Sequence, residues 1–139
     1  MNITVEQVQG MVPVTVLCTH GPLDRSNYEA LIAKAKELYQ AGSRDLLIDM
    51  SDTAFMSSAG LVALHAIALL MSGKKPPDPE AGWDAFRAID RDRSSGVQQH
   101  VKLLNPQPQV DKALGTTGMK QFFDIYADRE EAIASFSPD

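Results

Sequence analysis

The strongest constraint on the fold is a strand and a helix that are both apolar on nearly every side. Leu46, Leu47 and Ile48 are consecutive apolar residues without alternation, which predicts a strand covered on both faces. A short linker over 51–56 follows, and residues 57–71 then predict a helix that is apolar nearly all round. These segments predict an α/β domain in which a central strand lies in a sheet with helices packed on it.

Two further strands are predicted before the central one. Apolar and polar residues alternate over 3–6, and Val12, Val14, Val16 and Cys18 fall at every second position, which is the period of a strand. Gly10 lies between the two runs and suits a tight reversal of the chain. Pro13 has no backbone N–H to donate, so it predicts an edge strand or the first residue of a strand.

The helix that precedes the central strand has a start signal and a stop signal. Ser26 and Glu29 form a capping-box pattern, with Ser26 as the N-cap and Glu29 reaching back to it. Apolar residues then recur at helical spacing from Leu31 to Tyr39. Gly42 is suited to end this helix in a left-handed conformation.

The second half of the chain alternates strands and helices. We predict strands over 100–104 and 122–126, a short helix over 109–114, and a last helix behind the capping box of Asp128 and Glu131. The order is β-β-α-β-α, an insertion, and then β-α-β-α. Such alternation implies parallel strands joined by crossover connections. We therefore expect a mixed sheet of about four to five strands, with the N-terminal strands at one side, packed with about four helices.

Residues 74–98 interrupt this pattern, and we interpret them as an insertion within a single domain spanning 1–139. The segment is too polar for a core and too long for a simple connection. Within it Trp83, Phe86 and Ile89 recur every third residue, which suits a short one-sided helix. Two interpretations stay open. The segment is either a solvated flap that packs back on the domain or an added contact surface for a partner.

Composition and charge exclude several classes of function. The 139 residues have a net charge of −5, so the chain lacks the basic face that a nucleic-acid binder needs. Its three histidines are isolated and Cys18 is its one cysteine, so we predict no metal site and no cofactor. The longest apolar run, 59–71, is interrupted by His65 and is too short to span a bilayer. Because the first residues lack the pattern of a secretory signal, we expect a cytoplasmic protein.

Two adjacent hydroxyls, Ser57 and Ser58, lie where the apolar helix is predicted to begin. The simplest interpretation is that one of them is the N-cap of this helix. A functional interpretation rests on the electrostatics of a helix start, where unpaired N–H groups stabilise an anion. A phosphate on either serine would leave the helix folded and add a charge of about −2 to the surface.

Several segments, taken together, resemble the STAS domain, the fold of bacterial anti-sigma factor antagonists. The strand that ends at Ser51 is followed by Phe-Met-Ser-Ser-Ala-Gly-Leu over 55–61, and then by the apolar helix. Further similarities are Gly-Pro-Leu-Asp at 21–24, Leu-Asn-Pro at 104–106 and the turn over 114–119. Each motif is weak by itself, and their joint order and spacing carry the resemblance.

The resemblance covers residues 1–73 and 99–136 and implies a site of phosphorylation. Aligned on Gly60, the phosphorylated serine of the family falls on Ser58. Many members carry an aspartate where this chain has Ser57, so Ser57 is the alternative acceptor.

The function that the resemblance implies is that of a non-catalytic switch. When unphosphorylated, such an antagonist binds an anti-sigma factor that is also a serine kinase, and this frees the sigma factor. The kinase phosphorylates the serine with ATP and the complex dissociates, after which a metal-dependent serine phosphatase resets the cycle. A homodimer is a further assembly that we leave open.

The docking surface of the family lies around the phosphorylated serine and the loop before the first helix. Carried over by resemblance, the partner-binding residues are Asp24, Ser57, Ser58, Gly60, Leu61 and Leu64. We expect Gly60 to permit close approach of the partner backbone and Leu61 to offer an apolar contact. The alternative for Leu61 and Leu64 is core packing, and for Asp24 it is a role in a cap or turn.

Two other functions are weighed against this one. A constitutive STAS subunit of a transport complex or signalling scaffold would bind its partner without a phosphorylation switch. A small serine hydrolase would use Ser58 as nucleophile in a Gly-x-Ser-x-Gly elbow, but Met56 stands where the first glycine belongs. We therefore predict that the chain is not an enzyme.

Overall fold

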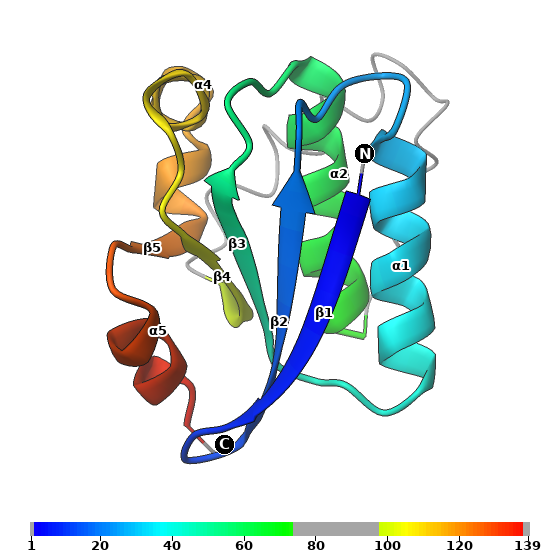
Figure 1. The fold of residues 1–139 in the computed structure, drawn as a ribbon, viewed down its shortest axis with the longest axis vertical. Helices are drawn as coiled ribbons and strands as arrows, with labels where there is room; N and C mark the ends of the chain where they lie inside the picture. The colour runs from blue at the N-terminus through cyan, green and yellow to red at the C-terminus, as the bar shows by residue number, and fades with distance from the viewer. Residues whose placement is uncertain (1, 74–97, 138–139) are drawn as a thin grey trace.

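A mixed sheet runs through the molecule with its five strands side by side in chain order (Figure 1). The structure is a computed structural model that describes residues 2–73 and 98–137. The strands are β1 (Asn2–Gln9), β2 (Pro13–His20), β3 (Leu46–Asp52), β4 (Gln98–Leu104) and β5 (Phe123–Tyr126). β1 is antiparallel to β2, and all the other neighbours are parallel. The mixed sheet with its N-terminal strands at one side is therefore confirmed.

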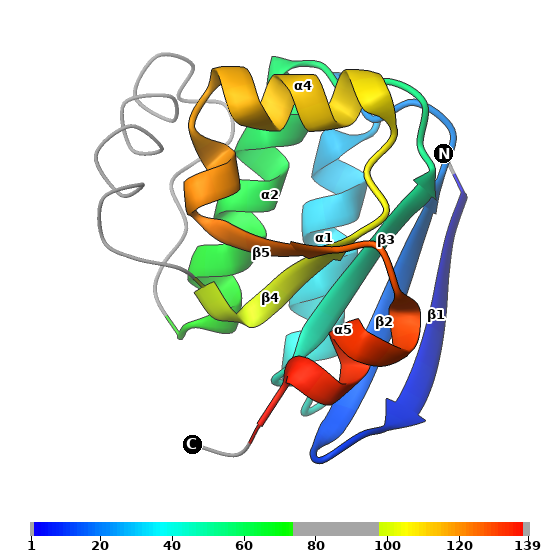
Figure 2. The same cartoon turned by 90° about the vertical axis from the view of Figure 1, so that its left-hand side faces the viewer.

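Helices cover both faces of this sheet (Figure 2). They are α1 (Tyr28–Gln40), α2 (Ser58–Met71), α4 (Pro108–Thr116) and α5 (Arg129–Ser135), with a 3-10 turn η3 at Met119–Gln121. α1, α2 and α4 lie on one side and α5 lies on the other. Two separate apolar clusters result, a large one beneath α1 and α2 and a smaller one beneath α5.

β3 lies at the centre of the sheet and contributes to both clusters. Leu46 and Ile48 pack in the large cluster, whereas Leu47 packs in the small one, and all three are fully buried. Successive side chains of a strand point to opposite faces, so the first three positions of β3, which are covered on both faces, are all apolar. This burial is the reason for the unbroken apolar run in the sequence.

The start of α1 differs from the predicted capping box. The helix begins at Tyr28, and its N-cap is Asn27 rather than Ser26. Ser26 is drawn into the preceding turn, because its backbone N–H and its hydroxyl both donate to Asp24 Oδ1, at 2.9 and 2.5 Å. The side chain of Asn27 does not cap either, because it is bonded to Pro22 O and to the N–H of Asp24.

Other local predictions are confirmed. Gly42 has a φ of +111° and its N–H donates to Tyr39 O, while the next N–H donates to Leu38 O, which is a Schellman ending of α1. Asp128 caps α5, since its side chain accepts a hydrogen bond from Glu130 N–H. Pro13 is the first residue of β2, so the strand-start interpretation holds and the edge belongs to β1.

The predicted insertion at 74–98 lies outside the described residues except for Gln98, which already belongs to β4. Trp83, Phe86 and Ile89 are among the residues that lie outside the described ranges. None of the described helices has the length and apolar character that crossing a membrane requires.

A first prediction tests whether the C-terminal end closes the second face of the sheet. Phe136 is 1% exposed in the cluster beneath α5, whereas Phe55 is 46% exposed. Phe136→Ala should lower the free energy of unfolding by about 3–5 kcal/mol, because it removes a buried aromatic ring and leaves a cavity. Phe55→Ala should change it by about 0.5 kcal/mol or less, as surface substitutions do. Urea denaturation measures both, and equal losses would contradict the packing of this face.

Candidate functional site

The two serines at the start of α2 have different environments. Ser57 is the N-cap by position, with φ −86° and ψ 179°, but its side chain forms no capping hydrogen bond. Its Oγ is buried and has no partner within the described part of the chain. Ser58, the first residue of the helix, is exposed, and among the described residues its hydroxyl is bonded to no other group. Ser58 is therefore the accessible hydroxyl of the pair.

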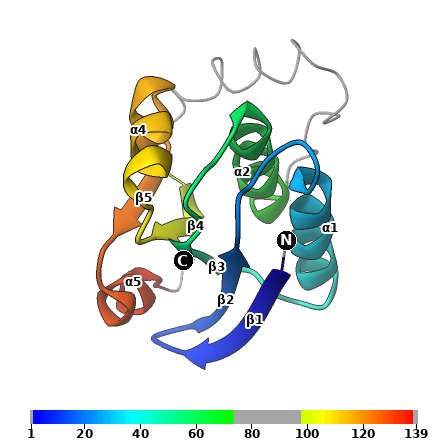
Figure 3. The same cartoon turned by 45° about the horizontal axis from the view of Figure 1, so that its top comes forward.

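The linker between β3 and α2 is bound along one side by the loop between β2 and α1 (Figure 3). Leu23 and Met56 form an isolated parallel β-bridge. Leu23 N–H donates to Phe55 O and Ser57 N–H donates to Leu23 O, both at 2.9 Å. This ladder brings Asp24, the residue after Leu23, to the start of α2.

The other side of the linker is bound by α4. Gln109 Oε1 accepts a hydrogen bond from Met56 N–H at 2.8 Å, and Gln109 Nε2 donates to Met56 O at 3.3 Å. Gln107 Nε2 donates to Ser51 O at 2.7 Å, where β3 ends. Neither glutamine could be predicted from the sequence, because their partners lie more than fifty residues earlier and no short-range pattern marks such a contact.

Three of the predicted partner-binding residues lie inside the fold. Leu64 is 0% exposed and Leu61 is 4% exposed, and Gly60 is buried as well. The core-packing alternative therefore describes both leucines, which support the surface from beneath and do not form it. Gly60 likewise has a role inside the fold. A Cβ at position 60 would lie 2.3 Å from Met56 Cγ and 3.0 Å from Leu23 Cγ, so the glycine admits the chain's own linker and loop.

Asp24 is partly exposed and closes the turn before α1. Its backbone carbonyl accepts hydrogen bonds from the N–H groups of Asn27 and Tyr28. Hydrogen bonds from the Ser26 hydroxyl and from the Ser26 N–H hold the pKa of the Asp24 carboxyl below its usual value. The turn alternative is thus realised, and it keeps a negative charge on the loop beside α2.

The surface at this end of the sheet thus combines a free hydroxyl, a carboxylate and an aromatic ring. Solvent can reach the side chains of three residues there: Ser58, Asp24 and Phe55, the last of which is 46% exposed. We call these three residues the Ser58 surface. Within the described ranges, no three His, Cys, Asp or Glu side chains come together as a metal ion would need. The Ser58 surface is suited to contact a protein and to accept a covalent group.

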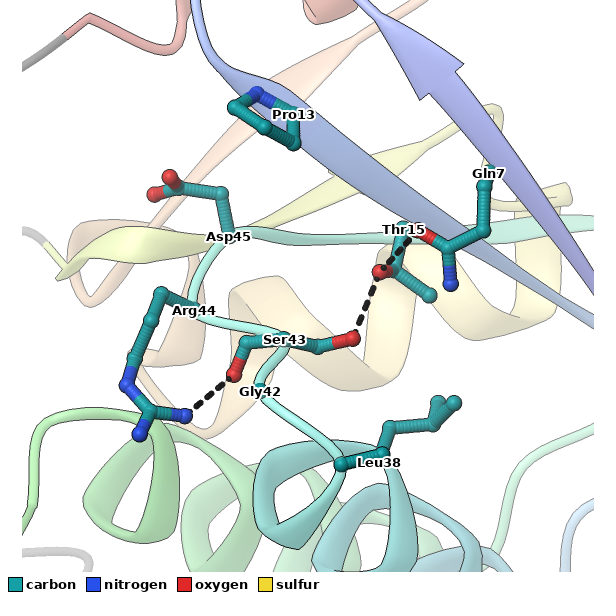
Figure 4. Close-up of a pocket in the computed structure, with 9 residues that line it drawn as sticks. Gln7, Pro13, Thr15, Leu38, Gly42, Ser43, Arg44 and Asp45 are labelled. Carbon is teal, nitrogen blue, oxygen red and sulfur yellow. Dashed lines mark hydrogen bonds between the residues drawn. The ribbon is translucent and has the colours of Figure 1, made fainter.

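A separate pocket lies at the opposite end of β3, between the first two strands and the turn after α1 (Figure 4). Its polar groups bind one another. Thr15 Oγ1 donates to Gln7 Oε1 at 3.0 Å and lies 2.9 Å from Ser43 Oγ. Arg44 donates to two backbone carbonyls there, including that of Ser43. These bonds fasten the turn to the sheet, and we do not take the pocket as the functional site.

Comparison with known proteins points to one family. The sequence profile of the STAS domain matches residues 2–71, half of the chain. BtrV of Bordetella bronchiseptica, named as a candidate anti-sigma factor antagonist, is 23% identical over 136 residues, which are 98% of this chain and 95% of that protein.

Solved structures share the fold. A candidate anti-sigma factor antagonist from Thermotoga maritima has a TM-score of 0.71 at 17% identity, covering 96% of this chain and 93% of that one. The anti-sigma factor antagonist SpoIIAA of Bacillus is 21% identical. Its unphosphorylated form has a TM-score of 0.53 and covers 95% of this chain and 94% of its own, and its phosphorylated form has a TM-score of 0.54, with 95% and 96% covered.

A second prediction tests the close approach at position 60. Gly60→Ala should lower the free energy of unfolding by about 1–3 kcal/mol, because the added methyl overlaps Met56 and overpacks the helix start. Gly115→Ala is the matched control, since its Cβ would meet only the side chain of Lys120, 3.7 Å away. Thermal and urea unfolding compare the two, and a Gly60→Ala protein as stable as the control would contradict the contact.

A third prediction concerns the charge of Asp24. Ser26→Ala removes the hydroxyl donor and should raise the pKa of the Asp24 carboxyl toward 3.8, as followed by NMR titration. Because the folded pKa is depressed, the hydrogen bonds stabilise the wild-type fold above pH 3.8 and lose this effect as the pH falls through the folded pKa. Ser58→Ala is the control and should leave the titration unchanged. If the pKa of Asp24 were the same in the Ser26→Ala protein as in wild type, the Ser26 hydroxyl would not be the cause of its low value.

Proposed function

This chain belongs to the STAS domain family, and from that premise we propose that it is an anti-sigma factor antagonist controlled by phosphorylation of Ser58. The observation that carries the proposal is the contrast between the two serines. Ser58 is an exposed residue in the first turn of α2, whereas Ser57 Oγ is buried. A kinase can reach the first without unfolding the helix, and we therefore prefer Ser58 to Ser57 as the acceptor.

A phosphate on Ser58 is compatible with the fold. The first turn of a helix has N–H groups that lack intrahelical partners, and its positive dipole end stabilises an anion. The modification therefore changes the charge of the surface while α2 persists. A switch of this kind requires that the modification alters the surface that binds the partner and leaves the fold beneath it unchanged.

The same phosphate opposes binding of a partner. It adds a charge of about −2 to a surface that already carries the Asp24 carboxylate, whose low pKa keeps it ionised. A partner that docks over Ser58 would bury this charge, which costs several kcal/mol unless it is neutralised. Since about 1.4 kcal/mol changes an affinity tenfold, this cost is enough to release the partner.

The partners that we propose are those that the resemblance to the family implies. We propose that the unphosphorylated chain binds an anti-sigma factor serine kinase, which transfers a phosphate from ATP to Ser58, and that a serine phosphatase removes it. The existence of SpoIIAA in unphosphorylated and phosphorylated forms supports such a cycle for a protein of this fold. We propose no enzymatic activity for the chain itself. A hydrolytic serine needs a base bonded to its hydroxyl, and Ser58 has none among the described residues.

The fourth prediction is that charge at position 58 abolishes binding of the kinase. Affinity capture from the native lysate, with mass spectrometry of the bound proteins, should recover an ATP-binding serine kinase with wild type and with Ser58→Ala. Ser58→Asp should retain at least tenfold less of it, because a charge is buried without a partner. Ser58→Asn is the matched control, with the same shape and no charge, and should retain more than Ser58→Asp.

Two outcomes would contradict this function. If Ser58→Asp retains the same partner as wild type, the constitutive-subunit interpretation replaces the switch. If neither protein retains a kinase, antagonism of a kinase-type anti-sigma factor is wrong for this chain.

A further inference from the structure

The linker that carries Phe55, Met56 and Ser57 is hydrogen-bonded on both sides, like the middle strand of a sheet. Phe55 O and Ser57 N–H bond to Leu23 on one side. Met56 N–H and Met56 O lie between them in the chain and bond to the Gln109 side chain on the other side. Successive residues of an extended segment direct their backbone groups to alternate sides. The Gln109 amide therefore occupies the place of a third strand.

The chemistry of an amide side chain suits this place. Met56 presents one donor and one acceptor in the same direction, at 2.8 and 3.3 Å from Gln109 Oε1 and Nε2. Glutamine carries an acceptor oxygen and a donor nitrogen on one planar group, whereas a carboxylate only accepts. A glutamate at position 109 would keep the bond from Met56 N–H and turn an oxygen toward Met56 O.

This bonding determines what the linker exposes. Met56 is 2% exposed, and its side chain lies against Gly60 at the start of α2. Gln109 holds the backbone of Met56, and the core holds its side chain. The neighbouring residues of the linker are therefore fixed in one orientation relative to the start of α2. Phe55 and Ser58 are then the exposed residues on either side of this anchor.

We infer that Gln109 is a positioning residue for Ser58, which holds the linker in the conformation that presents the Ser58 surface to the partner. The identity of the partner in this inference rests on the proposed function. The hydrogen bonds between Gln109 and Met56 do not depend on it. It makes the N-terminus of α4 part of the switch, although this helix follows Ser58 by about fifty residues and contributes no group to the surface. Preorganisation of this kind raises affinity by lowering the ordering cost of binding.

The first arm of the test is amide hydrogen exchange by NMR in wild type, Gln109→Ala and Gln109→Glu. Loss of one hydrogen bond should speed exchange of the Met56 amide by about three- to tenfold in Gln109→Ala. The Ser57 amide, bonded to Leu23 O, serves as an internal reference and should change less. Gln121→Ala is the matched control, an exposed glutamine without a described side-chain bond. Unchanged exchange at Met56 in Gln109→Ala would overturn the inference.

The second arm measures capture of the kinase by the same proteins. Gln109→Ala and Gln109→Glu should each retain about three- to tenfold less kinase than Gln121→Ala, although Ser58 is intact in all of them. Faster exchange at Met56 with unchanged capture would reduce Gln109 to a structural residue and overturn its positioning role. If wild type captures no kinase, the proposed function fails, and the exchange at Met56 alone then decides whether Gln109 holds the linker.

Discussion

The burial of β3 on both faces is the constraint on which the rest of the molecule depends. Leu46 and Ile48 require the layer of α1 and α2, and Leu47 requires α5 on the opposite face. Because β2 is parallel to β3, with His20 beside Asp52, the segments that follow these strands emerge side by side. The sheet thereby brings the loop with Asp24 against the linker with Ser58. This arrangement follows the general rule that sites in α/β folds form beyond the carboxyl ends of parallel strands.

Local bonding then separates two serines that are neighbours in the chain. The β-bridge between Leu23 and Met56 holds the linker in an extended form up to the start of α2. Ser57, still part of this ladder, has its hydroxyl buried, whereas Ser58 begins the helix and is exposed. The difference between them is geometric and not chemical. It is the physical basis on which we propose Ser58, and not Ser57, as the acceptor of a phosphate.

The order of elements and the position of Ser58 could be predicted from the sequence, because they depend on local periodicity and on a short motif. The predicted start of α2 at 57 differs from the structure by one residue. Side-chain competition was not predictable, since Asp24 takes the Ser26 hydroxyl that a capping box would use. The sequence also could not separate a surface leucine from a buried one at 61 and 64, because α2 is apolar all round. The role of Gln109 could not be predicted either, because its contact with Met56 joins residues that are 53 positions apart in the sequence.

The most direct test of the central claim is to map phosphate on the protein isolated from its own cells under phosphatase inhibition. Peptide mass spectrometry should find the phosphate on Ser58 in wild type and in a Ser57→Ala protein, and it should find none in the peptide of a Ser58→Ala protein. A phosphate carried by Ser57, or an unmodified peptide under every growth condition in which the kinase is bound and active, would contradict the account of an exposed acceptor at the start of α2.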